Sequence, residues 1–295
     1  PSNPVEGQVW YNTTTNVVKG VVNNPGSWAT GGALNTGRSS LAGAGTQTAG
    51  LAFGGAIPGS LSAVTESYNG TAWTEVNDLT TARYNLAGAG TNTAALAFGG
   101  RTPTTVAITE TWNGTNWTEV NDLNLARNAL AGCGTNTATL AFGGGYPAKN
   151  ETETWNGTNW TEVNNLNTAR EKLGGAGTST AALAFGGQPN TGNTELWNGT
   201  NWTEVNNLGT ARYGLAGAGT NTAALAFGGT TPPNSALTES WNGTNWTEVG
   251  DLGTARPELA GAGTNTAALA FGGAGYLTAT EEFIAGPATV TFDNS

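Results

Sequence analysis

The feature that most limits the possible folds is one sequence unit that occurs six times in succession. Each copy contains a segment close to ALAFGG, and its double glycine recurs at spacings of 45, 44, 43, 42 and 44 residues, from Gly54 to Gly272. An arginine follows the same period, and a tryptophan stands ten residues before each arginine, as Trp73 does before Arg83. Three markers that recur in step predict a repeat protein whose copies stack on one another.

The copy between Arg83 and Arg127 reads as four β-strands joined by turns. Its apolar, alternating and β-prone stretches predict strands at 86–90, 94–100, 108–112 and 116–123. The dipeptide Asn113-Gly114 is typical of a hairpin turn between the last two. Four antiparallel strands of this length form one propeller blade. We therefore predict an all-β fold, a six-bladed β-propeller of four-stranded antiparallel blades.

The repeat resembles the kelch family of β-propellers. The double glycine at the end of the second strand, followed by an aromatic residue and then a tryptophan, carries this resemblance over residues 25–285. The aromatic pairs are closer together than is usual in that family. They are Tyr68/Trp73, Trp112/Trp117, Trp155/Trp160, Trp197/Trp202 and Trp241/Trp246. The resemblance implies a propeller that serves as an interaction module.

The two ends of the chain predict how the ring closes. Trp28 precedes the first full copy without a double glycine before it, whereas the last copy stops after Phe283 without its fourth strand. We expect the N-terminal strand around Trp28 to complete the last blade, because closure removes exposed sheet edges. Residues 1–24 are then an N-terminal extension with a hairpin, 25–285 the propeller and 286–295 a tail that pairs with the extension. The segment 7–22 also looks like short segments of phage tail proteins.

Each aromatic pair spans the predicted third turn. A two-residue turn would make Trp112 and Trp117 diagonal neighbours, and a four-residue turn would place them directly opposite, so both lie on one face in either case. Because the pair recurs in blade after blade, we expect it to pack against a neighbouring blade. The alternative is that exposed tryptophans stack on sugars.

A periodic glutamate accompanies each periodic arginine, two residues before the first aromatic position. The repetition favours structural ion pairs between or within blades over an active site, because active sites break symmetry. Solvated charges and a sialidase-like arginine cluster are the alternatives. The predicted structural rings consist of Arg38, Arg83, Arg127, Arg170, Arg212, Arg256 and of Glu66, Glu110, Glu153, Glu195, Glu239, Glu281.

Composition bounds the chemistry. The chain has no histidine and one cysteine, so imidazole or multi-cysteine metal sites and histidine-based triads are excluded, and we expect no cofactor and no enzymatic activity. A net charge of −10 argues against nucleic-acid binding, and no apolar run is long enough to insert in a membrane. Cys133 replaces an alanine of the sister copies and reads as a small buried residue.

The sequence leaves open whether the turns are glycosylated and whether neighbouring loops bind calcium. The NGT and NWT triplets in the third turns match the N-glycosylation pattern, although hairpin chemistry explains their asparagines equally well. Calcium could bind near Asp78, Asp122 and Asp251, but each copy supplies few carboxylates.

Variation among the copies is concentrated on one predicted face of the disc. The connection after each double glycine and the two residues after each arginine differ from copy to copy, whereas the first and third turns barely change. In a four-stranded meander these two variable elements share a face, and loops on a rigid scaffold commonly carry recognition. Drift in tolerant loops is the alternative. The predicted binding residues on this face are Tyr84, Arg101, Tyr146, Lys172, Tyr213 and Tyr276.

These observations predict a non-enzymatic recognition or structural module. The leading hypothesis is a virion, tail-fibre or other extracellular propeller that binds a host-surface glycan or protein, or another virion protein, through its variable loops. The alternative is an intracellular scaffold for protein–protein interactions. The ligand and the oligomeric state stay open.

Overall fold

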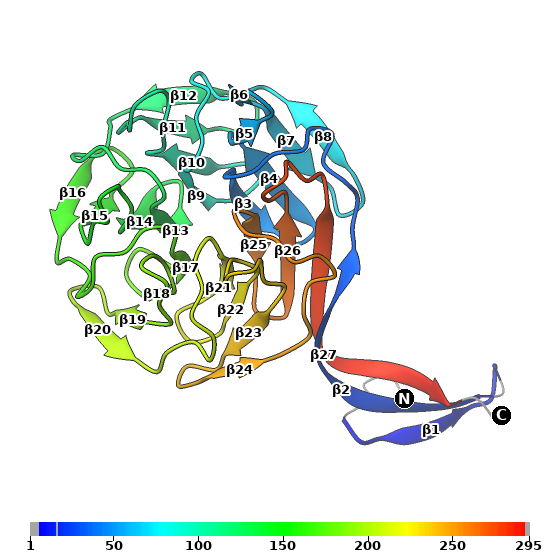
Figure 1. The fold of residues 1–295 in the computed structure, drawn as a ribbon. Coiled ribbons are helices and arrows are strands. Elements are labelled where there is room, and N and C mark those ends of the chain that lie inside the picture. Colours follow the sequence, from blue (N-terminus) through cyan, green and yellow to red (C-terminus); the bar gives the residue numbers. More distant parts are fainter. Residues whose placement is uncertain (1–5, 16, 293–295) are drawn as a thin grey trace.

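The computed structural model describes residues 6–15 and 17–292 as an all-β molecule. Six sheets stand around a central axis like the blades of a propeller (Figure 1). Each blade has four antiparallel strands in meander order, with the first strand next to the axis and the fourth at the rim. The described residues contain no helix that is long and apolar enough to span a membrane. The predicted fold class is confirmed.

Five blades consist of strands that follow one another in the chain. Blade 1 contains β3 (Ala42–Thr46), β4 (Ala49–Phe53), β7 (Thr65–Tyr68) and β8 (Trp73–Val76). Blade 2 contains β9 (Ala87–Gly90), β10 (Ala95–Phe98), β11 (Thr109–Trp112) and β12 (Trp117–Val120). Blade 3 contains β13 (Ala131–Thr135), β14 (Ala138–Phe142), β15 (Thr152–Trp155) and β16 (Trp160–Val163). Blade 4 contains β17 (Gly174–Gly177), β18 (Ala182–Phe185), β19 (Thr194–Trp197) and β20 (Trp202–Val205). Blade 5 contains β21 (Ala216–Gly219), β22 (Ala224–Phe227), β23 (Thr238–Trp241) and β24 (Trp246–Glu248).

The sixth blade joins the two ends of the chain, as the sequence predicts. Its inner strands are β25 (Ala260–Gly263), β26 (Ala267–Phe271) and the first part of β27 (Thr280–Phe292). The outer strand is the second part of β2 (Val17–Thr30), which places Trp28 opposite Phe283. The last blade is thus closed by a strand from the other end of the chain.

A three-stranded arm projects from blade 6 (Figure 1). It consists of β1 (Val9–Asn12), the first part of β2 and the second part of β27, so the predicted hairpin and its pairing with the tail are both present. β2 and β27 run from the blade into the arm as single strands, with a register shift between Asn24 and Ser27.

Small residues line the axis because there is no room for larger ones. In the inner strand β9, a Cβ on Gly88 would lie 2.5 Å from the Cζ of Phe53 in blade 1 and 2.8 Å from the carbonyl oxygen of Gly43. The second strands carry the fully buried apolar residues, such as Leu96 and Phe98. Alternation of small inner and large middle residues therefore lets six sheets approach a common axis.

The aromatic pairs join each blade to the preceding one. Trp112 lies directly opposite Trp117 across a four-residue turn, with ring centroids 5.4 Å apart, and the two are 2% and 5% exposed. The Trp117 ring packs at 4.9 Å on Phe53 of blade 1, and its Nε1–H donates to Thr65 Oγ1 there at 3.0 Å. The packing prediction is confirmed, and the sugar-stacking alternative is wrong for these buried rings.

Candidate functional site

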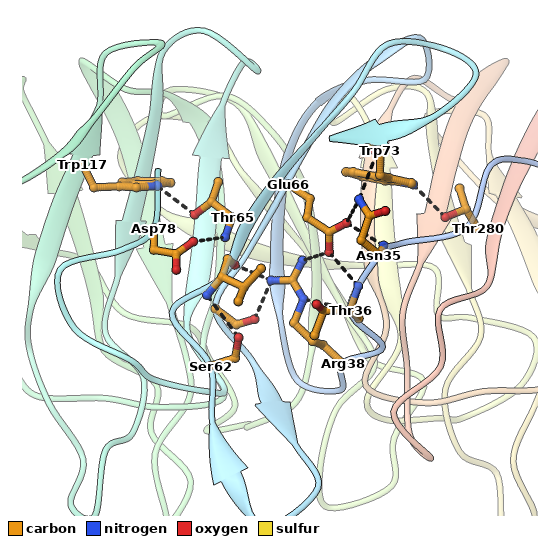
Figure 2. Close-up of polar contacts among 12 residues, drawn as sticks. Asn35, Thr36, Arg38, Ser62, Thr65, Glu66, Trp73, Asp78, Trp117 and Thr280 are labelled. Carbon is orange, nitrogen blue, oxygen red and sulfur yellow. Dashed lines mark hydrogen bonds and ion pairs between the residues drawn. The ribbon is translucent and has the colours of Figure 1, made fainter. Parts of the chain in front are cut away.

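All six periodic arginines form ion pairs with the periodic glutamates, and each pair lies within one blade. The distances between a terminal guanidinium nitrogen and Glu Oε1 range from 2.5 to 3.3 Å, and every arginine side chain is fully buried. In blade 1, shown in Figure 2, Arg38 Nη2 lies 2.9 Å from Glu66 Oε1. Its Nη1 donates to the carbonyl oxygens of Gly54 and Val64, at either end of the variable connection.

The glutamate of each pair also binds the link that enters the blade. Asn35 donates to Glu66 Oε2 from its backbone N–H at 2.7 Å and from Nδ2 at 2.9 Å. Thr80, Asn124, Asn167, Gly209 and Gly253 donate their backbone N–H in the same way in the other blades. Burial lowers the pKa of each arginine, and the paired glutamate opposes that shift. The arrangement holds the loops against the sheet in each blade, with the guanidinium groups fully buried.

The aspartates considered as calcium ligands have a structural partner. Asp78, Asp122 and Asp251 each accept a hydrogen bond from the backbone N–H of a third-strand threonine at 2.9–3.0 Å. Asn165 and Asn207 do the same in blades 3 and 4, at 3.0 Å. Within residues 6–15 and 17–292, no group of three or more His, Cys, Asp or Glu side chains could hold a metal ion. A neutral amide serves equally well at this position, so the role needs an acceptor oxygen rather than a charge.

The uniform face of the disc has a structural reason for its uniformity. The first and third turns adjoin there, because Trp112 Nε1 donates to the carbonyl oxygen of Asn92 at 3.0 Å. The third turns of blades 2 to 5 also accept a hydrogen bond from the preceding blade, as Asn77 Nδ2 donates to Asn116 Oδ1 at 2.8 Å. The constancy of these turns therefore follows from packing and is no evidence that the other face was selected for binding.

On the variable face, the residue after each arginine is bonded to the connection after the double glycine. Tyr84 and Arg101 exchange both backbone hydrogen bonds, at 3.1 and 2.8 Å. Equivalent isolated bridges join Ser39 to Ala56, Glu171 to Gln188 and Tyr213 to Thr230. Both variable elements thus lie on one face, and short antiparallel contacts hold them to the scaffold.

One groove of about 480 Å³ opens on this face above blades 6, 1 and 2. One side is a small hairpin of β5 (Ala56–Ile57) and β6 (Ser60–Leu61), which the sequence analysis treated as loop. The groove is lined by Ala56, Ile57, Gly59, Ser60, Leu61, Tyr84, Arg101, Thr102, Pro103 and Tyr276. Three of the six predicted binding residues, from three parts of the chain, therefore meet in one cavity.

The other predicted binding residues do not line this groove. Tyr146 projects from the blade 3 connection with 88% of its surface exposed, and Tyr213 is half-buried beside blade 5. Lys172 lies at the mouth of the central channel, where its Nζ is 2.7 Å from Glu258 Oε1 of blade 6. Ser40 Oγ also bonds Glu258, at 3.0 Å to Oε2.

A continuous circle of backbone hydrogen bonds surrounds the mouth of the central channel. The second residue after each arginine donates its N–H to the carbonyl oxygen of the equivalent residue in the neighbouring blade, at 2.7–2.9 Å. Each of these residues has a left-handed backbone, with φ between 53° and 64°. The members are Ser40, Asn85, Ala129, Lys172, Gly214 and Glu258. Lys172 and Glu258 form an ion pair that spans this mouth.

Cys133 is buried in the inner strand of blade 3, as its alanine-like position predicts. Burial raises the pKa of its thiol to about 12, which keeps it protonated and unreactive at neutral pH. It has no place in the groove.

Sequence reasoning missed Ile57, Leu61 and Pro103 in the groove and Glu258 in the channel mouth. The Pro58-Gly59 dipeptide between Ile57 and Ser60 is a turn signal that could have indicated the extra hairpin. Nothing local to Glu258 points to Lys172, because the two residues are 86 positions apart.

No protein-family model matches this chain, and the search of curated proteins finds no match.

Proposed function

We propose that this chain is a non-enzymatic recognition module that contacts its partner through the variable-loop face. The observation that carries the proposal is the groove in which Tyr84, Arg101 and Tyr276 converge. Tyrosine and arginine are the residue types that most often dominate binding energy. The groove is open to solvent, so its tyrosine and arginine side chains are accessible to a partner. The repeated residues serve packing, whereas the residues that line this groove differ from copy to copy.

The kelch-like aromatic and glycine pattern supports an interaction role, since propellers of that kind present loops on a rigid disc. The segment 7–22 looks like phage tail sequences, and this likeness favours a virion or extracellular setting in which the partner is a host-surface glycan or protein. An intracellular scaffold is the alternative. It would be favoured if the same face captured intracellular proteins in a pull-down and bound no cell surface.

The test compares two sets of substitutions that lie on opposite faces. The loop-face variant changes Tyr84, Arg101, Tyr146, Tyr213 and Tyr276 to serine, and the control changes Asn92, Asn136 and Asn221 to serine. The control keeps the tryptophan hydrogen bonds, because these use the backbone carbonyl groups of the three asparagines. None of the substituted side chains is fully buried, so both variants should remain folded, and their melting temperatures are compared with that of the wild type.

The fluorescently labelled full chain is applied to a glycan array and to a panel of intact bacterial cells. We expect the loop-face variant to lose every wild-type signal and the control to retain it. Retained attachment by the loop-face variant, or a loss confined to the control, would contradict the proposal. A wild-type chain that binds nothing in either format would point to a structural spacer.

A further inference from the structure

We infer that the groove between the β5–β6 hairpin, Tyr84, Arg101 and Tyr276 binds a saccharide that carries a carboxylate. This inference rests on the proposed recognition function and names its ligand class. The carboxylate would pair with the Arg101 guanidinium, and the sugar ring would lie against the tyrosines. The hydroxyl groups of Ser60 and Thr102 line the same cavity and can bond sugar hydroxyls.

The surroundings of Arg101 differ from those of every other arginine in the chain. The six periodic arginines are fully buried and paired with glutamate, whereas Arg101 is exposed and takes part in no ion pair among the described residues. No acidic residue lines the groove, although the chain as a whole carries a net charge of −10. The groove is therefore a local cationic site that complements an anion, and a guanidinium matches the two oxygens of a carboxylate.

The backbone holds Arg101 and Tyr84 together. Because they form a hydrogen-bonded pair in a short antiparallel bridge, their side chains project on the same side. A second bridge joins Arg101 to Thr105, so the arginine sits in a small braced structure rather than a free loop.

Tyr276 faces the same cavity from blade 6. Its left-handed backbone, with φ of 57°, is uncommon for a residue other than glycine, and such conformations cluster at ligand sites. The chain at Gly37 packs closely on this residue: a Cβ on Gly37 would lie 2.1 Å from the Tyr276 carbonyl oxygen, so only glycine allows the approach. The two tyrosines thus stand on separate, fixed supports, which lowers the entropy cost of binding.

A sugar fits this site better than an acidic peptide does. Extended peptides are commonly held by main-chain hydrogen bonds to a free strand edge. The backbone N–H and C=O groups of Tyr84 and Arg101 bond each other, which leaves that edge occupied. The site instead offers two amphipathic aromatic rings, short apolar residues and hydroxyls, a combination that suits the apolar ring faces and polar rim of a pyranose.

The test uses saccharide pairs that differ in the carboxylate. Oligogalacturonate is compared with a galacto-oligosaccharide of equal length, and sialyllactose with lactose, by calorimetric titration of the full chain. We expect at least one carboxylated member to bind about tenfold or more tightly than its neutral counterpart, as expected for a charge-assisted hydrogen bond. Arg101→Met should abolish this preference, and Tyr276→Ala should weaken both members of the pair. Asn136→Ser, on the opposite face, should change neither.

Three results would overturn the inference. They are no preference for the carboxylated sugar in the wild-type chain, a preference that persists in Arg101→Met, and Arg101-dependent binding of an oligoglutamate peptide without saccharide binding. Any of them could occur while the loop-face variant still loses attachment to cells, in which case the proposed function stands and only its ligand class fails. If cell attachment instead resists the loop-face variant, the proposed function fails, and the titration still shows whether the groove binds sugars.

Discussion

At the scale of single residues, the buried arginines show how one side chain can fasten several segments. Arg127 donates to the carbonyl oxygens of Gly143 and Glu151 at 3.0 and 2.7 Å and to Glu153 Oε1 at 2.8 Å. It therefore joins the link into blade 3 to the second strand and to the third. A neutral side chain could not replace it, because a rigid fork of several donors is needed to satisfy oxygens that are out of reach of water.

Arg127→Met should lower the free energy of unfolding by about 3–5 kcal/mol, because it leaves the Glu153 carboxylate buried without its partner. The matched control is Arg101→Met, the same change at the exposed arginine, which should shift stability by less than about 0.5 kcal/mol. Urea denaturation measures both. The double variant Arg127→Met/Glu153→Met should recover part of the loss, since it removes the unpaired charge. Equal stability of Arg127→Met and wild type would show that the pair is not needed.

At the scale of elements, the third strand of each blade contacts both neighbouring blades. In β11, Trp112 belongs to an apolar cluster with Leu51 and Phe53 of the preceding blade, and Glu110 accepts a hydrogen bond from Thr80 in the link that follows that blade. Thr109 accepts a 3.1 Å hydrogen bond from Trp160 Nε1 of the following blade. In the pattern Thr-Glu-x-aromatic of this strand, the threonine thus contacts the following blade, and the glutamate and the aromatic residue lie on the side of the preceding blade. This explains why three of its four positions hardly vary among the copies.

Thr109→Val keeps the shape of the side chain and removes the oxygen that accepts the Trp160 N–H. The buried indole donor then has no partner, so we expect a loss of about 1–3 kcal/mol in unfolding free energy. Thr118→Val on the exposed side of β12 is the control and should be nearly neutral. Thermal unfolding followed by tryptophan fluorescence compares them. If Thr109→Val unfolds together with its control, the bond between these blades contributes nothing measurable.

At the scale of the whole molecule, three kinds of contact repeat between all neighbouring blades and so form closed rings around the axis. The first joins a tryptophan to the phenylalanine of the preceding blade, the second joins the same tryptophan to a threonine, and the third is the backbone circle at the channel mouth. Where blade 1 meets blade 6, the repeat departs from its usual residues. Gln47 bonds the carbonyl oxygens of Ala268 and Phe283, and Tyr68 donates its hydroxyl to Glu282. Burial and this bond raise the pKa of Tyr68 to about 12. The closing seam thus has residues adapted to it.

Removing residues 1–32 should open the ring, because blade 6 loses its outer strand and Trp28 no longer bonds Thr238. The exposed edge of β27 and the uncovered Phe227 and Phe283 should cause aggregation or a loss of cooperative melting. Removing only residues 1–16 keeps β2 and should leave melting cooperative. Light scattering and calorimetry distinguish these results. A stable, monomeric chain that lacks residues 1–32 would disprove closure by the N-terminal strand.

The repeat made the blades, their number and their closure predictable from sequence. The signals that predict strands and hairpins act over a few residues, and they recur in successive copies of the repeat. They are strand alternation, double glycines and hairpin asparagines. Arg38 and Glu66 were assignable to a pair because two residue types of opposite charge kept one period. The Pro58-Gly59 hairpin was missed because it occurs in a single copy, where no repetition separates signal from chance.

The sequence by itself thus determined the blade, the ring and the face on which its copies vary. Only the tertiary structure decided which variable residues meet: Tyr84, Arg101 and Tyr276 share a groove, whereas Lys172 turns to the axis and pairs with Glu258. The reason is geometric. Bending six sheets into a ring brings together side chains separated by tens to nearly two hundred positions, and the circle of hydrogen bonds holds even Ala129 and Lys172 in a left-handed backbone that their own chemistry disfavours. No local pattern encodes a conformation that neighbours impose.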